Sequence, residues 1–268
     1  MYLQYIVVCG NRPAHFVPAK RIVGGITVRP GTWPFMISLH GGPGQNFFCG
    51  ASLLSHTWVL TAAHCIGSLT RNDQLTLKIG ATRRDTFSEY RQIRKPKQMI
   101  HHEDYNVMTV ENDIALIELA EPVYFNDYTR PVCLPKEGYT TPVGTRCYAA
   151  GWGKNSEIAT EYQRAMKQVN LDIRDQESCR EALKTSERPT PYKLTDRMMC
   201  AGGSIGHDAC SGDSGGPLIC EADETSDIWY VAGVTSWGIG CATDVPGVYT
   251  KVSLYIDWIR NTTHNALP

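Results

Sequence analysis

The chain has 268 residues, of which 42% are apolar, enough to bury a sizeable core in one large domain or two small ones. Its 26 basic and 27 acidic side chains give a net charge of -1, which excludes a global attraction to nucleic acid or to an anionic membrane. The apolar content predicts a soluble globular protein, and the near-zero net charge implies that its partners are chosen locally. No apolar run reaches the ~20 residues of a membrane span, so a membrane anchor would have to lie outside this chain.

The first residues are typical of a precursor rather than of a folded domain. Tyr2 to Val8 is apolar but too short for a complete signal sequence, and we interpret it as the remnant of a longer one. Residues 10–20 carry two prolines and no periodicity, as linkers do. The basic pair Lys20-Arg21 then precedes Ile22-Val-Gly-Gly25, so a protease that cuts after basic residues would release a new amino terminus at Ile22.

From residue 22 onward, short apolar runs alternate with Gly, Pro, Asn and Asp, which predicts strands joined by turns. Because regular alternation of strands and helices is missing, we expect an antiparallel all-β fold rather than an α/β-hydrolase. Apolar residues at helical spacing from Val252 to Ile259 predict one C-terminal helix. The clearest predicted strands are Phe35–Leu39, Leu75–Ile79, Ile114–Ile117, Tyr230–Val234 and Gly247–Val252.

Two polar residues beside apolar runs are candidates for proton transfer. His64 ends the stretch Trp58-Val-Leu-Thr-Ala-Ala-His-Cys65, and a neutral imidazole can take a proton at about pH 7. By itself, such a histidine is more often a hydrogen-bonded core residue. Asp113 precedes Ile114-Ala-Leu116, where a carboxylate is costly to bury unless a partner holds it. By itself, it is more often a turn residue that caps a strand.

Ser214 is the candidate nucleophile. It lies in the glycine-rich stretch Asp208-Ala-Cys-Ser-Gly-Asp-Ser-Gly-Gly-Pro217. Glycines beside it let the backbone turn sharply and let a substrate carbonyl approach main-chain N–H groups. The same Gly-x-Ser-x-Gly pattern also occurs in the elbow of α/β-hydrolases and in plain surface turns, so this stretch alone does not decide the chemistry.

The candidates occur in the order His64, Asp113, Ser214, which is that of chymotrypsin and neither that of subtilisin nor that of the hydrolases. From residue 9 to about residue 260, the chain resembles the chymotrypsin-like (trypsin-family) serine proteases. The resemblance implies an all-β fold of two packed six-stranded antiparallel Greek-key barrels with a C-terminal helix. It rests on six motifs in register: Ile22-Val-Gly-Gly25, Thr61-Ala-Ala-His-Cys65, Asp113-Ile-Ala-Leu116, Gly151-Trp-Gly153, Gly212-Asp-Ser-Gly-Gly-Pro217 and Ser236-Trp-Gly238.

The resemblance implies a division of roles among these residues. Ser214 Oγ would attack the scissile carbonyl while His64 takes its proton. Asp113 would hold the imidazole in the correct tautomer, with Ser236 as a hydrogen-bond partner. The backbone N–H groups of Gly212 and Ser214 would form the oxyanion hole.

The resemblance also implies activation by cleavage. A cut between Arg21 and Ile22 would let the new α-amino group of Ile22 pair with Asp213, a carboxylate that needs a counter-charge once it is buried. We therefore predict a zymogen whose uncut form is nearly inactive. The implied boundaries are residues 1–21 for a signal remnant and activation pro-segment, 22–261 for the trypsin-like serine protease domain and 262–268 for a polar tail.

Specificity for basic side chains follows from the positions that match the S1 pocket. Asp208, six residues before Ser214, matches the carboxylate at the pocket floor, which would select Arg or Lys; a solvated turn aspartate is the alternative interpretation. Ala209 replaces the serine common in trypsins and removes a hydroxyl that could help bind an ammonium group, so we expect Arg to be preferred over Lys. The other substrate-binding positions are Ser236, Trp237, Gly238 and Gly247.

The ten cysteines are never closer than ten positions, which excludes the spacing of zinc knuckles. Their even number and wide spread favour five disulfides in an oxidising compartment over ten buried thiols. The sequon Asn261-Thr-Thr263 fits a secreted glycoprotein. The resemblance implies the pairs Cys49–Cys65, Cys147–Cys220, Cys179–Cys200, Cys210–Cys241 and Cys9–Cys133, the last of which would tether the pro-segment.

We expect no cofactor and no metal ion. The stretch after Gly80 begins Ala81-Thr-Arg-Arg84 and lacks the first acidic ligand of the calcium site of trypsins, and Pro246 stands where sodium-regulated members carry an aromatic residue. The stretch Arg83 to Lys97 holds six basic and two acidic side chains, a candidate face for an acidic partner or a glycosaminoglycan, although a solvated face is the simpler interpretation. The long segment from Cys179 to Cys200 is expected to rim the outer substrate subsites.

These observations predict a secreted, monomeric serine endopeptidase zymogen. Its expected partners are protein or peptide substrates with Arg or Lys at P1, an activating trypsin-like protease, and serpin or Kunitz/Kazal-type inhibitors, with no nucleic acid. The main alternative is a catalytically inactive homologue that acts as a binding or scaffold protein, against which the intact set of three candidate residues argues. An esterase on an α/β fold is disfavoured by the order of those residues and by the strand pattern.

Overall fold

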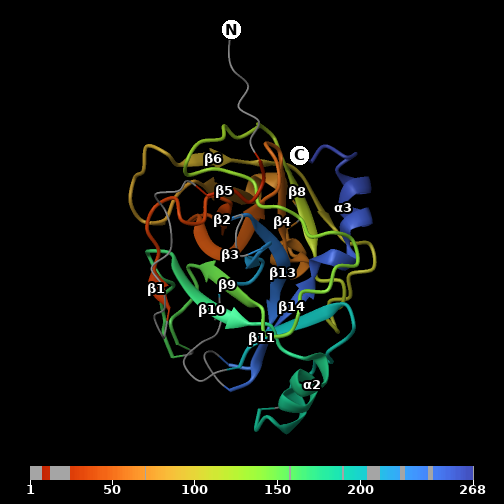
Figure 1. The fold of residues 1–268 in the computed structure, drawn as a ribbon. Helices are drawn as coiled ribbons and strands as arrows, with labels where there is room; N and C mark the ends of the chain where they lie inside the picture. The colour runs from red at the N-terminus through yellow and green to blue at the C-terminus, as the bar shows by residue number, and fades with distance from the viewer. Residues whose placement is uncertain are drawn as a thin grey trace.

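Two curled antiparallel sheets make up most of the protein, as seen in the computed structural model (Figure 1). The structure describes residues 8–12, 25–69, 71–156, 158–188, 190–203, 212–223, 227–240 and 244–267. Each sheet has seven strands, and every strand pairs antiparallel with its neighbours. The all-β antiparallel architecture expected from the sequence is therefore confirmed.

The first sheet has the strand order β6-β5-β2-β3-β4-β8-β7. Strands β6 and β7 stand at opposite ends of this order, yet only Lys95 separates them in the chain. The two edges must therefore meet, which closes the sheet on itself and makes β6 and β7 two parts of one bent segment. Its strands are β2 (Met36–Gly41), β3 (Asn46–Leu53), β4 (Trp58–Thr61), β5 (Leu75–Ile79), β6 (Gln92–Arg94), β7 (Pro96–His101) and β8 (Ala115–Leu119).

The second sheet has the order β1-β10-β9-β12-β13-β14-β11. An antiparallel bridge between Ile173, just after β10, and Ala201 of β11 brings two distant strands of this order together. The two-residue strand β1 adds the seventh member, one more than the six expected. Its strands are β1 (Ile26–Thr27), β9 (Arg146–Gly151), β10 (Lys167–Asp172), β11 (Met198–Gly202), β12 (Pro217–Glu221), β13 (Trp229–Trp237) and β14 (Pro246–Lys251).

Several strands are buried on both faces because each sheet encloses a core and packs against other elements. In β2 and β4 nearly every residue is buried, so these strands read as continuous apolar runs rather than as alternating ones. The predicted strand Leu75–Ile79 coincides with β5, and the other four predicted strands overlap β2, β8, β13 and β14 within a few residues. Burial of branched and aromatic side chains thus accounts for the fold that the apolar runs predicted.

Helices are few among the described residues. Ile256 and Ile259 of α3 (Ile256–Thr262) are buried in a core cluster to which both sheets contribute, which confirms the predicted C-terminal helix. It follows a short 3-10 helix, η3 (Val252–Leu254), so the predicted apolar stripe is shared by two elements. The other described helical segments are α1 (Ala63–Ile66), η2 (Asn72–Gln74) and α2 (Gln176–Thr185).

The helix α2 was not expected from the sequence. Its N-cap, Asp175, accepts hydrogen bonds from Glu177 N at 3.1 Å and Ser178 N at 2.9 Å, which satisfies two backbone donors of the first turn. Cys179 and Leu183 are its buried residues, and the helix projects from the end of the molecule opposite α3 (Figure 1). None of the described helices has the length and apolar character required to span a membrane.

Among the described residues, four disulfides join the sheets and loops. They are Cys9–Cys133, Cys49–Cys65, Cys147–Cys220 and Cys179–Cys200, the pairs that the resemblance implied. The fifth expected pair, Cys210–Cys241, lies outside the described residues. Cys9–Cys133 links the segment before the predicted cleavage site to the loop after the first sheet.

A buried histidine in β2 makes stability depend on pH. His40 is 2% exposed, its Nδ1 donates to Gln45 O at 2.9 Å, and its Nε2 lies 3.0 Å from Ser38 Oγ. Burial lowers the pKa of His40 to about 4, and the nearby charges of Lys78, Arg84 and Arg91 act in the same direction against the hydrogen bond to Gln45. The imidazole is therefore neutral in the folded protein at pH values where it is charged in the unfolded chain.

We expect the free energy of unfolding to fall as the pH falls from about 6.5 to about 4, because the unfolded chain then binds a proton at His40 that the folded protein does not. The loss from this residue reaches at most about 3 kcal/mol. Urea unfolding of the wild type and of His40→Gln across this range would measure it. Equal pH dependence of the two proteins would contradict the assignment to His40.

Candidate active site

A short helical turn and the loop before β8 bring His64 and Asp113 together. His64 belongs to α1, and its Nδ1 lies 2.7 Å from Asp113 Oδ2. The backbone N–H of His64 also donates to Asp113 Oδ1 at 2.9 Å. Because a carboxylate accepts and does not donate, Nδ1 carries the proton, and Nε2 of a neutral ring is left as an acceptor.

Asp113 is fully buried and is held from three directions. Besides the two bonds from His64, Ser236 Oγ donates to its Oδ2 at 2.5 Å. Thr250 Oγ1 of β14 donates to its backbone oxygen at 2.8 Å. The preceding residue, Asn112, has a φ of 55°, and Tyr255 OH lies 3.0 Å from Asn112 Oδ1. The bonds from His64 and Ser236 supply the partners that a buried carboxylate requires, and the other two contacts hold the backbone around it.

The half-buried Ser214 lies on a loop that packs against the disulfide beside His64. The backbone N–H of Gly50 donates to Ser214 O at 2.8 Å. A Cβ on Gly215, which has a φ of +76°, would lie 2.3 Å from Thr61 Oγ1 and 3.0 Å from Cys65 Sγ, so this close approach requires glycine. His64 Nε2 lies 3.6 Å from the same sulfur, so the Ser214 loop and the imidazole both pack against Cys65.

The loop before Ser214 packs against Gly151, Gly153 and Tyr162. Gly153 N donates to Asp213 Oδ1 at 2.9 Å, and a Cβ on Gly153 would lie 2.5 Å from Asp213 Oδ2. Gly212 has a φ of +99°, and a Cβ there would lie 2.6 Å from the ring of Tyr162. A substituted residue would therefore move this turn and redirect the backbone N–H groups that flank Ser214.

Two of the expected pocket-lining glycines face each other. The nearest described atom to a Cβ built on Gly238 would be Gly247 Cα, at 3.9 Å. Gly238 is exposed, whereas Gly247 is buried in β14. The remaining expected residues of this region, Asp208 and Ala209, lie outside the described residues, as do Arg21 and Ile22 of the predicted cleavage site.

Comparison with known proteins places this chain in a family. The family model described as Trypsin matches residues 22–259. The chain belongs to the trypsin family of serine endopeptidases. In this trypsin-family chain the contact between His64 and Asp113 is present on the two-sheet fold, and the role of Ser214 as nucleophile stays a prediction.

Two curated relatives give the degree of similarity. "Tryptase" from Mus musculus is 37% identical over 257 residues, which cover 93% of this chain and 91% of that protein. "Transmembrane protease serine 9" from Rattus norvegicus is 39% identical over 261 residues, which cover 96% of this chain. This trypsin-family chain spans only 23% of the length of the rat protein.

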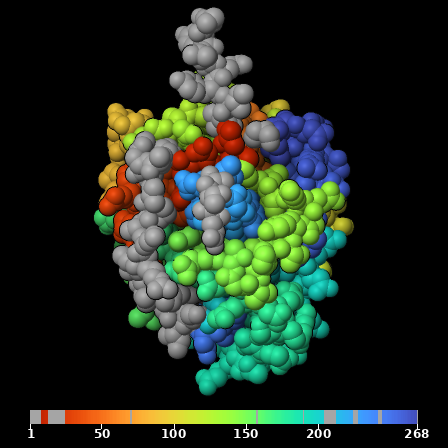
Figure 2. Space-filling view, viewed as in Figure 1, coloured from red at the N-terminus to blue at the C-terminus, as the bar shows by residue number. Residues whose placement is uncertain are grey.

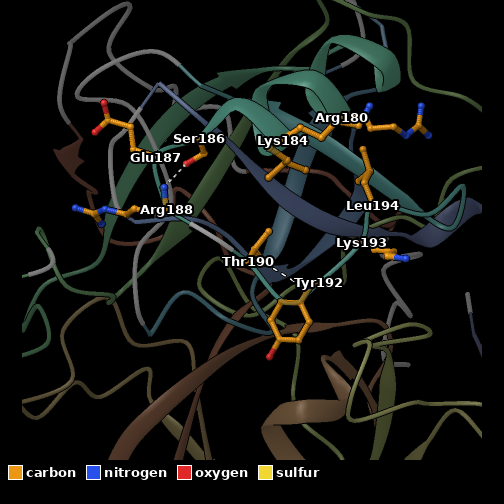
Figure 3. Close-up of a pocket in the computed structure, with 10 residues that line it drawn as sticks. Arg180, Lys184, Ser186, Glu187, Arg188, Thr190, Tyr192, Lys193 and Leu194 are labelled. Carbon is orange, nitrogen blue, oxygen red and sulfur yellow. Dashed lines mark hydrogen bonds between the residues drawn. The ribbon is translucent and has the colours of Figure 1, made fainter.

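The segment from Cys179 to Cys200 borders a cavity beside one of the expected substrate-binding residues. The cavity has a volume of about 630 Å³, and four of the side chains that line it are basic: Arg180, Lys184, Arg188 and Lys193 (Figure 3). Arg180 pairs with Glu177, and Lys184 pairs with Glu181 at 2.6 Å. The ring of Tyr192, another lining residue, lies 5.5 Å from that of Trp237, so this segment reaches the edge of the candidate site.

The basic stretch from residue 83 to residue 97 is largely occupied with internal contacts. Arg84 donates to Gln163 O at 2.9 Å and stands 4.6 Å from the centre of the Phe47 ring. This favours a structural role for much of the positive charge, and an acidic partner at this face stays a prediction. The other contacts are Arg83 with Asp85, Arg91 with Thr86 O, Arg94 with Pro122 O, Lys95 with Thr76 Oγ1, and Lys97 with Glu118.

Several residues that support the candidate site were not identified from the sequence. Thr250 and Tyr162 make their contacts across large sequence separations, and neither belongs to a motif that signals a role. Gly153 did stand in a recognised motif, but its contact with Asp213 was not foreseen. The signal available for it was glycine on both sides of Trp152, since paired glycines often mark a close backbone approach.

The expected glycosylation site lies on the surface. Asn261 is exposed in the last turn of α3, so the protein surface leaves room for a glycan there. This location is compatible with the prediction from the sequon and does not itself test it.

Proposed function

We propose that this chain is a secreted serine endopeptidase zymogen that, once cut between Arg21 and Ile22, hydrolyses peptide bonds after Arg and less readily after Lys. The observation that carries the proposal is the buried Asp113, which orients His64 through two hydrogen bonds at the position where the Ser214 loop converges. Membership of the trypsin family supports the reaction class.

In the proposed mechanism, His64 Nε2 removes the proton from Ser214 Oγ as that oxygen attacks the scissile carbonyl. The imidazolium formed is stabilised by Asp113, whose negative charge is already paired with the Nδ1 proton. The proton then passes to the leaving amine, and a water molecule hydrolyses the acyl-enzyme by the same steps in reverse order. Backbone N–H groups of Gly212 and Ser214 stabilise the oxyanion in both stages, each contributing on the order of 3 kcal/mol.

We propose that cleavage acts through Asp213. Its carboxylate lies on the loop that carries Ser214 and contacts the glycines of the Gly151-Trp-Gly153 motif. A free α-amino group at Ile22 would give this carboxylate a charged partner and thereby hold the oxyanion-binding N–H groups in position. The side chains of Asp208 and Ala209 would set the preference for Arg over Lys, with Gly238 and Gly247 leaving space for the long substrate side chain.

We further propose that the protein is exported, glycosylated at Asn261 and active as a monomer. Its disulfides fit an oxidising compartment, and Asn261 is accessible. Its activator would be a protease that cuts after basic residues, and its inhibitors would be serpins or Kunitz/Kazal-type proteins that present Arg or Lys.

The proposal is tested with matched peptide anilides that end in Arg, Lys or Phe. We expect little hydrolysis by the uncut chain, a rise in activity after treatment with immobilised trypsin, and the order Arg, then Lys, then Phe for kcat/KM. Removal of the immobilised trypsin keeps its own activity out of the assay, and Arg21→Gln serves as the chain that cannot be cut at this bond. Full activity of uncut protein would refute the zymogen, and preference for Phe would refute the assigned pocket.

A further inference from the structure

The described residues 8–12 are bound closely to the surface of the protease fold. Cys9 is joined to Cys133, Gly10 N donates to Pro131 O at 2.8 Å, and Trp229 N donates to Gly10 O at 3.1 Å. A Cβ on Gly10, which has a φ of +70°, would lie 2.2 Å from Trp229 O. Only glycine permits this approach, so the pro-segment is fitted to the start of β13 and not merely tethered to it.

The side chain of Arg12 fills a pocket on this surface. It is 3% exposed, and its guanidinium carbon lies 4.8 Å from the centre of the Trp33 ring and 4.3 Å from that of Trp229. Arg12 Nη2 donates to Asp227 Oδ1 at 2.5 Å. A guanidinium that packs on two indole rings, with a carboxylate bonded to it, has the features by which proteins recognise arginine. Figure 2 shows the red N-terminal residues on the surface next to blue residues of the second half of the chain.

The pocket is held in place by contacts that do not involve Arg12. Trp33 Nε1 donates to Gln168 Oε1 at 2.9 Å, and the Trp33 and Trp229 rings meet edge to face at 5.1 Å. Trp229 Nε1 donates to Asp227 Oδ1 at 2.9 Å, which orients the carboxylate. Both rings and the carboxylate are therefore already oriented to bind a cation, and little further ordering of these side chains is needed when it binds.

Burial of Arg12 also makes its removal from the pocket costly for the remaining groups. Its Nε and Nη1 are buried and have no hydrogen-bond partner among the described residues, so the two rings and Asp227 provide the compensation for the buried charge. Without the cation, the Trp33 and Trp229 faces would be exposed in an open pocket. Exposure of the two ring faces would favour the bound segment, whereas the two unpaired N–H groups of Arg12 oppose it, so the ring contacts and the Asp227 bond have to outweigh that cost.

We propose that Trp33, Trp229 and Asp227 form a guanidinium-binding site, separate from the proposed S1 pocket, whose ligand is Arg12 of the pro-segment. This site holds the pro-segment on the catalytic domain after activation, with or without the Cys9–Cys133 disulfide. The inference rests on the proposed function only for the cut after Arg21.

The test removes the covalent link and asks whether the segment stays. In a Cys9→Ser, Cys133→Ser chain, cut with immobilised trypsin and with the new terminus at Ile22 verified by sequencing, we expect the released segment to elute with the catalytic domain in gel filtration. Adding Arg12→Ala should weaken its binding on the order of 100-fold. Arg12→Lys should weaken it as well, because an ammonium group lacks the planar stacking surface. Asn11→Ala, at an exposed neighbour, is the matched control and should have little effect.

Two results would overturn the inference: release of the segment while Arg12 is present, or equal retention of the Arg12→Ala segment. Hydrogen exchange on the uncut double-serine chain gives a second measurement that needs no cleavage. The amide of Gly10 should exchange faster in Arg12→Ala and Arg12→Lys than in Asn11→Ala, and equal rates would also overturn the site. Anilide hydrolysis by the same samples reports separately on the proposed function, since loss of activity leaves the retention measurement intact.

Discussion

Ser214→Ala is expected to lower kcat toward an Arg-anilide by about 10⁵-fold to 10⁶-fold in the cut protein. Alanine keeps the backbone N–H of this position, and with it one expected oxyanion donor, but removes the oxygen that forms the acyl-enzyme. His64 then has no hydroxyl to activate, so only weak catalysis by positioning of water remains. The effect should appear in kcat with little change in the binding of substrate.

The measurement compares cut wild type, Ser214→Ala and Ser178→Ala after the immobilised trypsin has been removed. Ser178 is an exposed serine of α2 whose hydrogen bonds to Asp175 lie at the start of its own helix, so its replacement should leave the rate within about twofold. Thermal unfolding of the three proteins separates loss of chemistry from loss of fold. Activity of Ser214→Ala within tenfold of the wild type would assign the nucleophile to another residue.

Asp113→Asn is expected to lower kcat/KM by about 10⁴-fold. The carboxylate accepts from His64 N, His64 Nδ1 and Ser236 Oγ, and an amide can accept through only one of its two ends. If the amide NH₂ faces the ring, it donates to Nδ1, which moves the ring proton to Nε2. Nε2 can then no longer accept the proton of Ser214.

Thr250→Val is the matched control for this variant. It removes the bond to the backbone oxygen of Asp113 and leaves the carboxylate and its contact with the imidazole in place. We expect a loss of stability on the order of 1 kcal/mol and a rate within about tenfold of the wild type. Measuring kcat/KM of both variants with the Arg-anilide tests whether the carboxylate of Asp113 contributes to the rate. A loss in Asp113→Asn no larger than that in Thr250→Val would mean that Asp113 acts through packing alone.

The sequence predicted the parts of the fold that depend on local chain properties. Leu75–Ile79 was predicted as a strand because a short apolar run bounded by polar residues is typical of a buried strand. The helix α2 was missed because it has only two buried residues, so the burial that would have marked it is almost absent. The edges β6 and β7 were missed for a similar reason, since most of their residues are partly or fully exposed.

For the candidate site, the residue types and their order indicated the chemistry, whereas the contacts came from packing. A motif search finds His64 and Asp113 because they stand in stretches whose composition is unusual. It does not find Thr250, because a threonine in an apolar strand has no distinctive surroundings in the sequence. For the charged stretch near Arg84, composition favoured a solvated face over an acidic partner, and the structure adds internal contacts of Arg84 that no sequence pattern indicated.

By itself, the amino-acid sequence determined the family, the all-β class and the identity of the candidate nucleophile, base and acid, because these depend on residue type and spacing. Only the tertiary structure decided that Asp113 reaches His64 at 2.7 Å and that Arg12 packs on both Trp33 and Trp229. The reason is physical: Trp33 and Trp229 are about two hundred positions apart in the chain. Hydrophobic burial brings them into contact, and no local sequence pattern indicates that contact.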